Sequence, residues 1–403
     1  MELLKPIKYP KSKTSRLFRQ LLLPLCVGVC LLPMSKAQIT QPPLSQNPPL
    51  WSASPEQIGY SVSLSSDFNF TVGGDVVRIQ FLDGQRVALA WLTPDQPTKP
   101  VGRVIHVPCH LHLSVLDAQT GHQLLSHEWP CTSQSVNLAH TASGQWLLAN
   151  DESVTLYSSS FEKVRDLQHV RLGGHGFVSP SGRTFLSYVS DSQGVWSAQL
   201  RDSGTFEALD SWNDGRVAKA SFVYSDRFIL ARISRFREPQ QLFIREIGKS
   251  WSPFSQPLAT IYPTYGFLSN DTLLSLLGDQ LLAETVAGQE LFRQTVRAAE
   301  LSSGFGVALA TSRGGERFAL VLQRIKGFEN ELIDMTYRAD GHVIVYSVPH
   351  RSAIFIVKVK GELPWWVGGT SHAAWNRIAL SPDGLLLGIV SNKGVRVYAL
   401  PAD

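Results

Sequence analysis

"SHAAWNRIALSPDGLLLGIVSNKGVRVYAL", Ser371–Leu400, contains the pattern that decides the fold of this chain. A Ser-Pro-Asp-Gly turn signal at Ser381–Gly384 is followed at once by the apolar run Leu385–Val390. Polar residues separate this run from Gly394–Leu400, in which apolar and polar side chains alternate. Short apolar segments between tight turns are typical of β-strands rather than of helices. The stretch therefore predicts the first three strands of an antiparallel sheet.

The same combination of a turn signal and an apolar run occurs seven times along the chain. The second residues of these turns are residues 84, 144, 182, 226, 271, 315 and 384, so the spacings are 60, 38, 44, 45, 44 and 69. Four spacings match the length of one four-stranded propeller blade, and the two long ones indicate insertions. The sequence predicts an all-β fold, a seven-bladed β-propeller of four-stranded antiparallel blades.

The two insertions, Leu92–Pro108 and Arg324–Asp340, each join the second and third strands of a unit. They are therefore expected on the same face of the propeller. The chain ends on a third strand, Gly394–Leu400, with no fourth strand after it. We expect an N-terminal strand, "YSVSLSSDFNF" at Tyr60–Phe70, to supply the fourth strand and close the ring, which removes exposed sheet edges.

The last unit resembles a WD-repeat. It has His372 upstream, the Ser-Pro-Asp-Gly turn, an apolar strand and a third strand that ends near the aromatic Tyr398. "GGHGFVSPSGRTFLSYVSD" at Gly173–Asp191 resembles the repeat more loosely, and no Trp-Asp dipeptide closes a third strand. The resemblance implies a propeller that serves in scaffolding or binding, and it brings no catalytic residues with it.

The N-terminal segment resembles an export signal. Six basic residues precede the apolar run Leu21–Leu32, which is too short to span a membrane, and Ser35–Ala37 places small residues where a signal peptidase cleaves. Lipid attachment at Cys26 or Cys30 is the less favoured alternative, because neither follows a small residue. We predict a signal peptide over 1–37, a Pro-rich linker over 38–57 and the propeller over 58–403. The mature protein is expected in the periplasm or secreted, without an integral membrane segment.

The charge of the chain gives no indication of a nucleic-acid partner. The first 37 residues hold seven of the 37 Lys and Arg and one of the 33 Asp and Glu, which leaves 30 basic and 32 acidic residues. The basic isoelectric point therefore comes mostly from the signal segment. A near-neutral mature chain lacks the basic surface that binds nucleic acid, and we expect no nucleic-acid partner.

Two cysteines remain after the signal segment, Cys109 and Cys131. They flank a predicted hairpin that turns at Asp117–Gly121, so that residues whose numbers sum to about 240 face each other. The two cysteines sum to 240, and opposed cysteines in an antiparallel pair meet the distance limits of a disulfide. We predict a Cys109–Cys131 disulfide at the open end of this hairpin.

The same hairpin carries histidines. His110 and His112 lie two residues apart on one strand and share a face, and a register sum of 239 would place His127 opposite His112. Imidazoles in this arrangement suit zinc or copper. Polar decoration of an outer strand is the favoured interpretation, so we predict no metal and no other cofactor.

Two further groups are candidates for ligand binding. Trp365, Trp366, His372 and Trp375 lie in the connection to the last blade, and exposed indoles suit a carbohydrate ring or a protein hot spot. Arg235 and Arg237 share a strand face and suit an anionic ligand. Packing between blades and a solvated outer strand are the alternatives.

These observations predict an exported, non-catalytic propeller that binds a protein, carbohydrate or other ligand on its insertion-bearing face. The alternative is a hydrolase or lyase with its site at the mouth of the central channel, where His106 or His372 would act as a base. No nucleophile, phosphate-binding, zinc-protease or dinucleotide motif is present in the sequence. The chain is accordingly expected not to be an enzyme.

Overall fold

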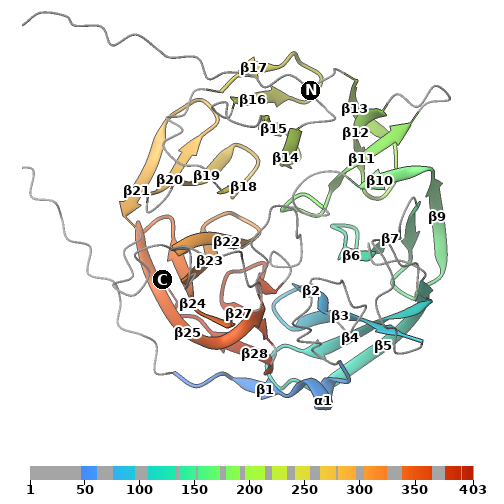
Figure 1. The fold of residues 1–403 in the computed structure, drawn as a ribbon, viewed down its shortest axis with the longest axis vertical. Coiled ribbons are helices and arrows are strands. Elements are labelled where there is room, and N and C mark those ends of the chain that lie inside the picture. Colours follow the sequence, from blue (N-terminus) through green and yellow to red (C-terminus); the bar gives the residue numbers. More distant parts are fainter. Residues whose placement is uncertain are drawn as a thin grey trace, which may run out of the picture. The chain divides into compact units, whose positions relative to one another are not determined.

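Seven four-stranded antiparallel sheets make up the chain in the computed structural model (Figure 1). The structure describes residues 47–60, 76–95, 108–131, 136–150, 153–172, 178–190, 196–213, 220–233, 241–254, 264–277, 280–295, 304–324, 338–364, 377–391 and 393–402. All of them belong to one compact unit, Gln41–Asp403. In this part of the chain no helix has the length and hydropathy to cross a membrane.

Each sheet is one blade, and in six of the seven blades the strands follow one another in sequence from the inside of the ring outward (Figure 1). Blades 1 and 2 are β2 (Val76–Phe81), β3 (Arg86–Pro94), β4 (Cys109–Asp117) and β5 (Gln123–Cys131), then β6 (Val136–His140), β7 (Trp146–Asn150), β8 (Ser153–Tyr157) and β9 (Lys163–Gln168). Blades 3 and 4 are β10 (Val170–Leu172), β11 (Thr184–Ser190), β12 (Trp196–Asp202) and β13 (Ala208–Trp212), then β14 (Ala220–Tyr224), β15 (Phe228–Ile233), β16 (Gln241–Glu246) and β17 (Ser252–Pro253).

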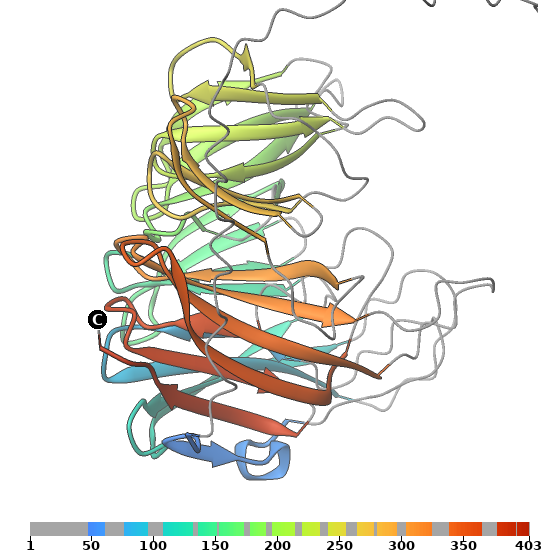
Figure 2. The same cartoon turned by 90° about the vertical axis from the view of Figure 1, so that its left-hand side faces the viewer.

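Blades 5 and 6 are β18 (Thr264–Phe267), β19 (Thr272–Leu277), β20 (Gln280–Thr285) and β21 (Glu290–Thr295), then β22 (Gly304–Thr311), β23 (Arg317–Arg324), β24 (Arg338–Ser347) and β25 (Ser352–Pro364). Blade 7 is β26 (Ile378–Leu380), β27 (Leu386–Ser391), β28 (Gly394–Ala399) and β1 (Trp51–Ala53). The strands of every blade run between the same two faces of the ring (Figure 2). The predicted fold class is confirmed.

All seven predicted turns join the first and second strands of a blade, so they meet on one face of the ring, here called the turn face. The second strands end and the third strands begin on the opposite face, so both predicted insertions start and finish there. Gly315 shows how closely the turns pack: its φ is +71°, and a Cβ at this position would lie 2.4 Å from the Leu268 carbonyl oxygen of blade 5. Only glycine fits there, because any side chain would enter the neighbouring turn.

An N-terminal strand closes the ring as predicted, but it is a different strand from the one expected. β1 pairs with β28, with Trp51 opposite Val397, and it lies in the segment interpreted as a linker. The expected strand, Tyr60–Phe70, lies outside the described residues except for Tyr60. The short helix α1 (Pro55–Ile58) follows β1 and begins with a Ser54 capping box. The three residues of β1 are flanked by prolines, which obscured the strand in the sequence.

The hydrophobic core is divided among the interfaces between blades. In β27 every residue is buried, and its side chains alternate between the two neighbours. Leu386 and Val390 pack with blade 1, whereas Leu387 and Ile389 pack with blade 6. The near-continuous apolar runs of the second strands therefore arise because both faces of each blade are covered.

A buried ion pair also joins two blades. Arg245 of blade 4 binds the Asp210 carboxylate of blade 3 through two hydrogen bonds of 2.9 and 2.6 Å. The guanidinium lies 5.6 Å from the Trp212 ring and 5.8 Å from the Trp251 ring. This arginine belongs to the same basic stretch as Arg235 and Arg237, and it serves the contact between blades.

Candidate ligand site in the central channel

A cavity of about 330 Å³ occupies the centre of the ring, and all seven blades line it. The lining residues fall near the ends of the inner strands β2, β6, β14, β18, β22 and β26 and in the first-to-second-strand turns. The cavity therefore lies toward the turn face. The sequence predicted ligand binding on the insertion-bearing face. The cavity instead lies toward the opposite face.

Arg78 is the charged side chain that enters this cavity from β2. Its neighbours Ile79 and Phe81 also line the cavity, but their side chains are buried against blade 7. Because side chains alternate along a strand, Arg78 shares its direction with Gln80. Burial lowers the pKa of Arg78 to about 10, and attraction to Tyr224 offsets part of this shift. The guanidinium stays protonated at neutral pH, in surroundings that disfavour its charge.

Tyr224 lies on β14, in the part of the ring across the channel from β2 (Figure 1). Its side chain is 4% exposed, and the Leu186 backbone N–H donates a hydrogen bond of 3.3 Å to its oxygen. Burial raises the pKa of Tyr224, Arg78 lowers it and Asp226 raises it further. The side chain therefore remains a neutral phenol opposite the Arg78 guanidinium.

His140 is the third titratable group at the cavity. Burial lowers its pKa first and the positive charge of Arg86 lowers it further, while a hydrogen bond to the Gly144 backbone and the charge of Asp83 raise it. The imidazole is therefore neutral at pH 7. Its backbone is held by Gln80, whose side-chain amide donates to the His140 carbonyl at 3.1 Å and accepts from its N–H at 3.0 Å.

Among the described residues that line the cavity, the charges are unbalanced. Its described lining residues include two guanidinium groups, Arg78 and the exposed Arg313, and no aspartate or glutamate. A charge removed from water needs a partner of opposite sign or hydrogen bonds to compensate its desolvation. The cavity therefore favours anions over cations.

Hydrogen bonds between blades fix the rim of the cavity. Ser179 of blade 3 donates to the Asp226 carboxylate of blade 4 at 2.7 Å. Ser225 of blade 4 donates to the Asn270 carbonyl oxygen of blade 5 at 2.8 Å, and the Asn270 side chain accepts from the Asp226 N–H at 3.2 Å. Because the turns of blades 3, 4 and 5 are tied together, the geometry of this part of the rim is set before any ligand binds.

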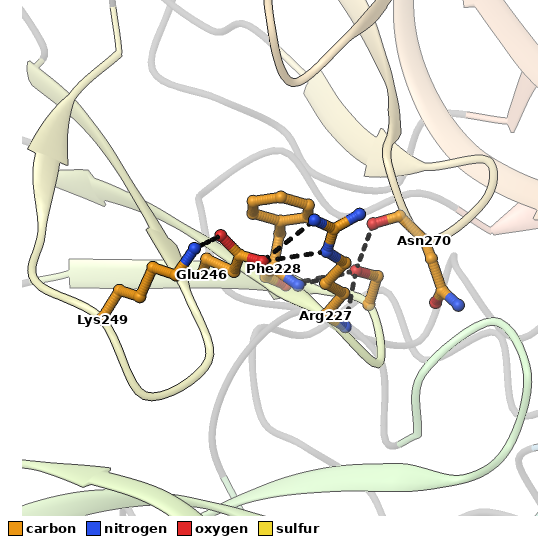
Figure 3. Close-up of polar contacts among 6 residues, drawn as sticks. Arg227, Phe228, Glu246, Lys249 and Asn270 are labelled. Carbon is orange, nitrogen blue, oxygen red and sulfur yellow. Dashed lines mark hydrogen bonds and ion pairs between the residues drawn. The ribbon is translucent and has the colours of Figure 1, made fainter.

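A charged cluster lies beside this rim on blade 4 (Figure 3). Arg227 and Lys249 both contact the Glu246 carboxylate, and hydrogen bonds from Lys249 and Arg227 lower the pKa of Glu246. The Arg227 guanidinium lies 5.0 Å from the Phe228 ring. Arg227 and Lys249 are mostly exposed, and exposed ion pairs contribute little stability. Unlike the cavity, this cluster pairs its cations with a carboxylate.

The predicted hairpin of blade 1 is confirmed, including its register. Cys109 pairs with Cys131 across β4 and β5, their Cα atoms are 5.1 Å apart, and the two form a disulfide. The Asp95 N–H donates to the Pro108 carbonyl oxygen at 3.0 Å beside it. The disulfide therefore lies at the base of the first insertion.

Of the three candidate histidines in this hairpin, His110 and His112 share one face of the sheet and His127 lies on the other. The register pairs His112 with Glu128 and His127 with Leu113, as a sum of 240 predicts, and not with the sum of 239 that would have placed His127 opposite His112. A shift of one residue moves a side chain to the other face of a sheet. His127 accordingly stacks on Phe161 with the ring centroids 4.1 Å apart, while His110 and His112 contact Glu128. Within the described residues, no three His, Cys, Asp or Glu side chains are placed to hold a metal ion.

The other candidates of the sequence lie outside the described residues. They are Trp365, Trp366, His372, Trp375, Arg235, Arg237 and His106. Their roles stay predictions. Conversely, Arg78 was missed by the sequence patterns, although a single cation inside the apolar strand "VVRIQF" was a usable signal.

Comparisons with known proteins concern the fold alone. No family model matches the chain, and no curated protein matches it. Among solved structures, it is similar to the C-terminal WD40 domain of Sif2 at 12% identity and a TM-score of 0.43, over 82% of this chain and 97% of that one.

Two further structures are similar in the same way. A chain of the mitotic checkpoint complex has 12% identity and a TM-score of 0.48, over 90% of this chain and 97% of that one. A chain of Kuenenia stuttgartiensis hydrazine synthase has 12% identity and a TM-score of 0.43, over 85% and 99%. Because these scores are low, the strand topology of the chain itself identifies it as a seven-bladed β-propeller.

Proposed function

We propose that this chain is an exported, non-catalytic propeller that binds a ligand in its central channel. The observation that carries the proposal is the cavity at the turn face, to which every blade contributes lining residues. A concave site at the junction of several structural units is where proteins most often bind small molecules.

The volume of the cavity limits what fits inside it. Ligand pockets in proteins measure about 300–1,000 Å³, so a cavity of about 330 Å³ lies at the small end of this range. A small organic molecule, or one end of a larger ligand, has this size. We also propose a second binding surface on the insertion-bearing face. There a protein or carbohydrate partner would contact Trp365, Trp366, Trp375 and Arg237.

The surroundings of His140 support binding rather than catalysis. A histidine that acts as a base is commonly oriented by a carboxylate. The His140 ring is hydrogen-bonded to the Gly144 backbone and packs edge-on against Trp146 with the ring centroids 4.9 Å apart, and the described cavity lining provides no carboxylate beside it. The proposed role of the channel is therefore to hold a ligand without changing it.

The disulfide supports the export part of the proposal. Disulfides persist in oxidising compartments and are rare in the cytosol. Cys109 and Cys131 form one at the base of an insertion, where it restrains the open end of the hairpin. The proposed location is the periplasm or the extracellular space.

The experiment is a thermal-shift screen of the full chain against carboxylic acids, sugar phosphates, neutral sugars and short peptides. Each compound that raises Tm is then mapped by hydrogen–deuterium exchange. We expect protection in the peptides that cover β2, β14 and β26, together with recovery of the compound unchanged after incubation. Protection confined to outer strands such as β5, β9 and β13, or conversion of the compound, would contradict the proposal.

A further inference from the structure

We infer that the channel ligand carries an oxyanion, a carboxylate or a phosphate, which the Arg78 guanidinium binds. This inference rests on the proposed function and names the chemical class of its ligand. It depends on the position of Arg78, on the charges around the cavity and on the rigidity of the rim.

The position of Arg78 gives the oxyanion a place to bind. Arg78 lines the cavity from β2, and the buried, neutral Tyr224 lines it from β14. A guanidinium offers five N–H donors in a planar fork that matches the two oxygens of a carboxylate or phosphate. An oxyanion in the channel would therefore accept two parallel hydrogen bonds from one side chain.

Guanidinium groups elsewhere in the described chain are compensated in two ways. Arg245 binds Asp210, Arg227 binds Glu246 and Arg86 binds Asp83 in direct ion pairs. Arg201 and Arg317 instead donate to backbone carbonyl oxygens, those of Phe206 and Gly384. At Arg78 the described cavity lining contains no carboxylate, so an ion pair there would need a ligand. A ligand oxyanion would supply in the channel what an aspartate or glutamate supplies elsewhere in the molecule.

The neutral groups around Arg78 add selectivity. Tyr224 and His140 are held in their uncharged forms, so neither repels nor neutralises an anion. Arg313 brings a second positive charge to the rim. A cationic ligand would meet two guanidinium groups, while the Asp226 carboxylate at the rim already accepts a hydrogen bond from Ser179, and we expect the channel to reject it.

The test is isothermal titration calorimetry on the full chain at low ionic strength, with four probes. Inorganic phosphate and succinate represent the two kinds of oxyanion, glucose is a neutral probe and choline is a cationic one. We expect at least one of the two oxyanions to bind, and glucose and choline not to bind. The comparison of phosphate with succinate identifies the preferred oxyanion.

Three variants connect this binding to Arg78. Arg78→Gln should weaken oxyanion affinity by at least about tenfold, because a hydrogen-bonded charge is lost. Arg78→Lys keeps the charge without the fork and should give an intermediate affinity. Arg227→Gln is the matched control, since it removes an exposed guanidinium outside the cavity and should leave the affinity within about twofold of the wild type.

The possible results separate this inference from the proposed function. Binding that Arg78→Gln does not weaken, or failure of both oxyanions to bind, overturns the inference. The proposed function survives that result if a neutral compound still protects β2 and β14 from hydrogen exchange. Circular dichroism and the Tm of each variant verify that it is folded. If Arg78→Gln does not fold, the oxyanion affinity of Arg78→Lys tests the role of Arg78.

Discussion

At the scale of single residues, the channel combines a destabilised charge with neutral neighbours. Arg78 remains protonated although burial lowers its pKa, and His140 is held neutral for the same physical reason. Desolvation disfavours the charged form of any base, whatever its ordinary pKa. The protonation states differ because the ordinary pKa of arginine lies far above neutral pH, whereas that of histidine lies near it.

His140 should make stability depend on pH. Because its pKa is lowered in the folded protein, the unfolded chain takes up the proton more readily, and stability falls as pH drops below about 6.5. His140→Gln removes this penalty. We expect the Tm of the wild type to fall relative to that of His140→Gln between pH 7.5 and 5.5, measured by scanning calorimetry. A Tm difference that stays constant over this range would show that His140 does not carry the effect.

At the scale of elements, the first-to-second-strand turns determine how the blades join. These turns were predictable, because Gly, Asp and Ser are required by their backbone geometry and therefore recur in the sequence. The closing strand β1 was not, since three residues among prolines carry too little pattern. The cavity was also beyond prediction, because it depends on strand ends from seven distant segments that only the closed ring brings together.

Comparing alanine variants of two glycines distinguishes the cost of backbone strain from the cost of a clash between neighbouring turns. Gly144 and Gly315 both have positive φ, but a Cβ at Gly144 meets no atom within 4 Å, whereas at Gly315 it meets the Leu268 carbonyl oxygen at 2.4 Å. Gly144→Ala should cost about 1 kcal/mol of unfolding free energy from its left-handed backbone alone. Gly315→Ala should cost roughly 2 kcal/mol more, because blade 5 must shift. Equal costs in urea denaturation would mean that the turns do not constrain one another.

At the scale of the whole propeller, closure joins the two ends of the ring. Trp51 of β1 pairs with β28 of blade 7 and donates from its indole nitrogen to the Ala118 carbonyl oxygen of blade 1 at 2.9 Å. A single residue therefore contacts the first and last blades in the sequence. The position of Arg78 relative to Tyr224 depends on this closure, because the blades that carry them are fixed only within a complete ring.

The contribution of closure can be measured at Trp51. Trp51→Ala should lower the free energy of unfolding by about 3 kcal/mol, because a large aromatic side chain and its hydrogen bond are lost. Leu50→Ala is the control, since the neighbouring side chain is 43% exposed and should change stability by less than about 0.5 kcal/mol. If urea denaturation gives the two variants the same stability, closure does not depend on this contact.

A crystal structure of the protein grown with succinate or phosphate would show directly whether an oxyanion binds in the channel. We expect electron density for the oxyanion inside the channel, with two of its oxygens within hydrogen-bond distance of the Arg78 guanidinium. Density for the anion only outside the channel, with water alone around Arg78, would contradict this expectation.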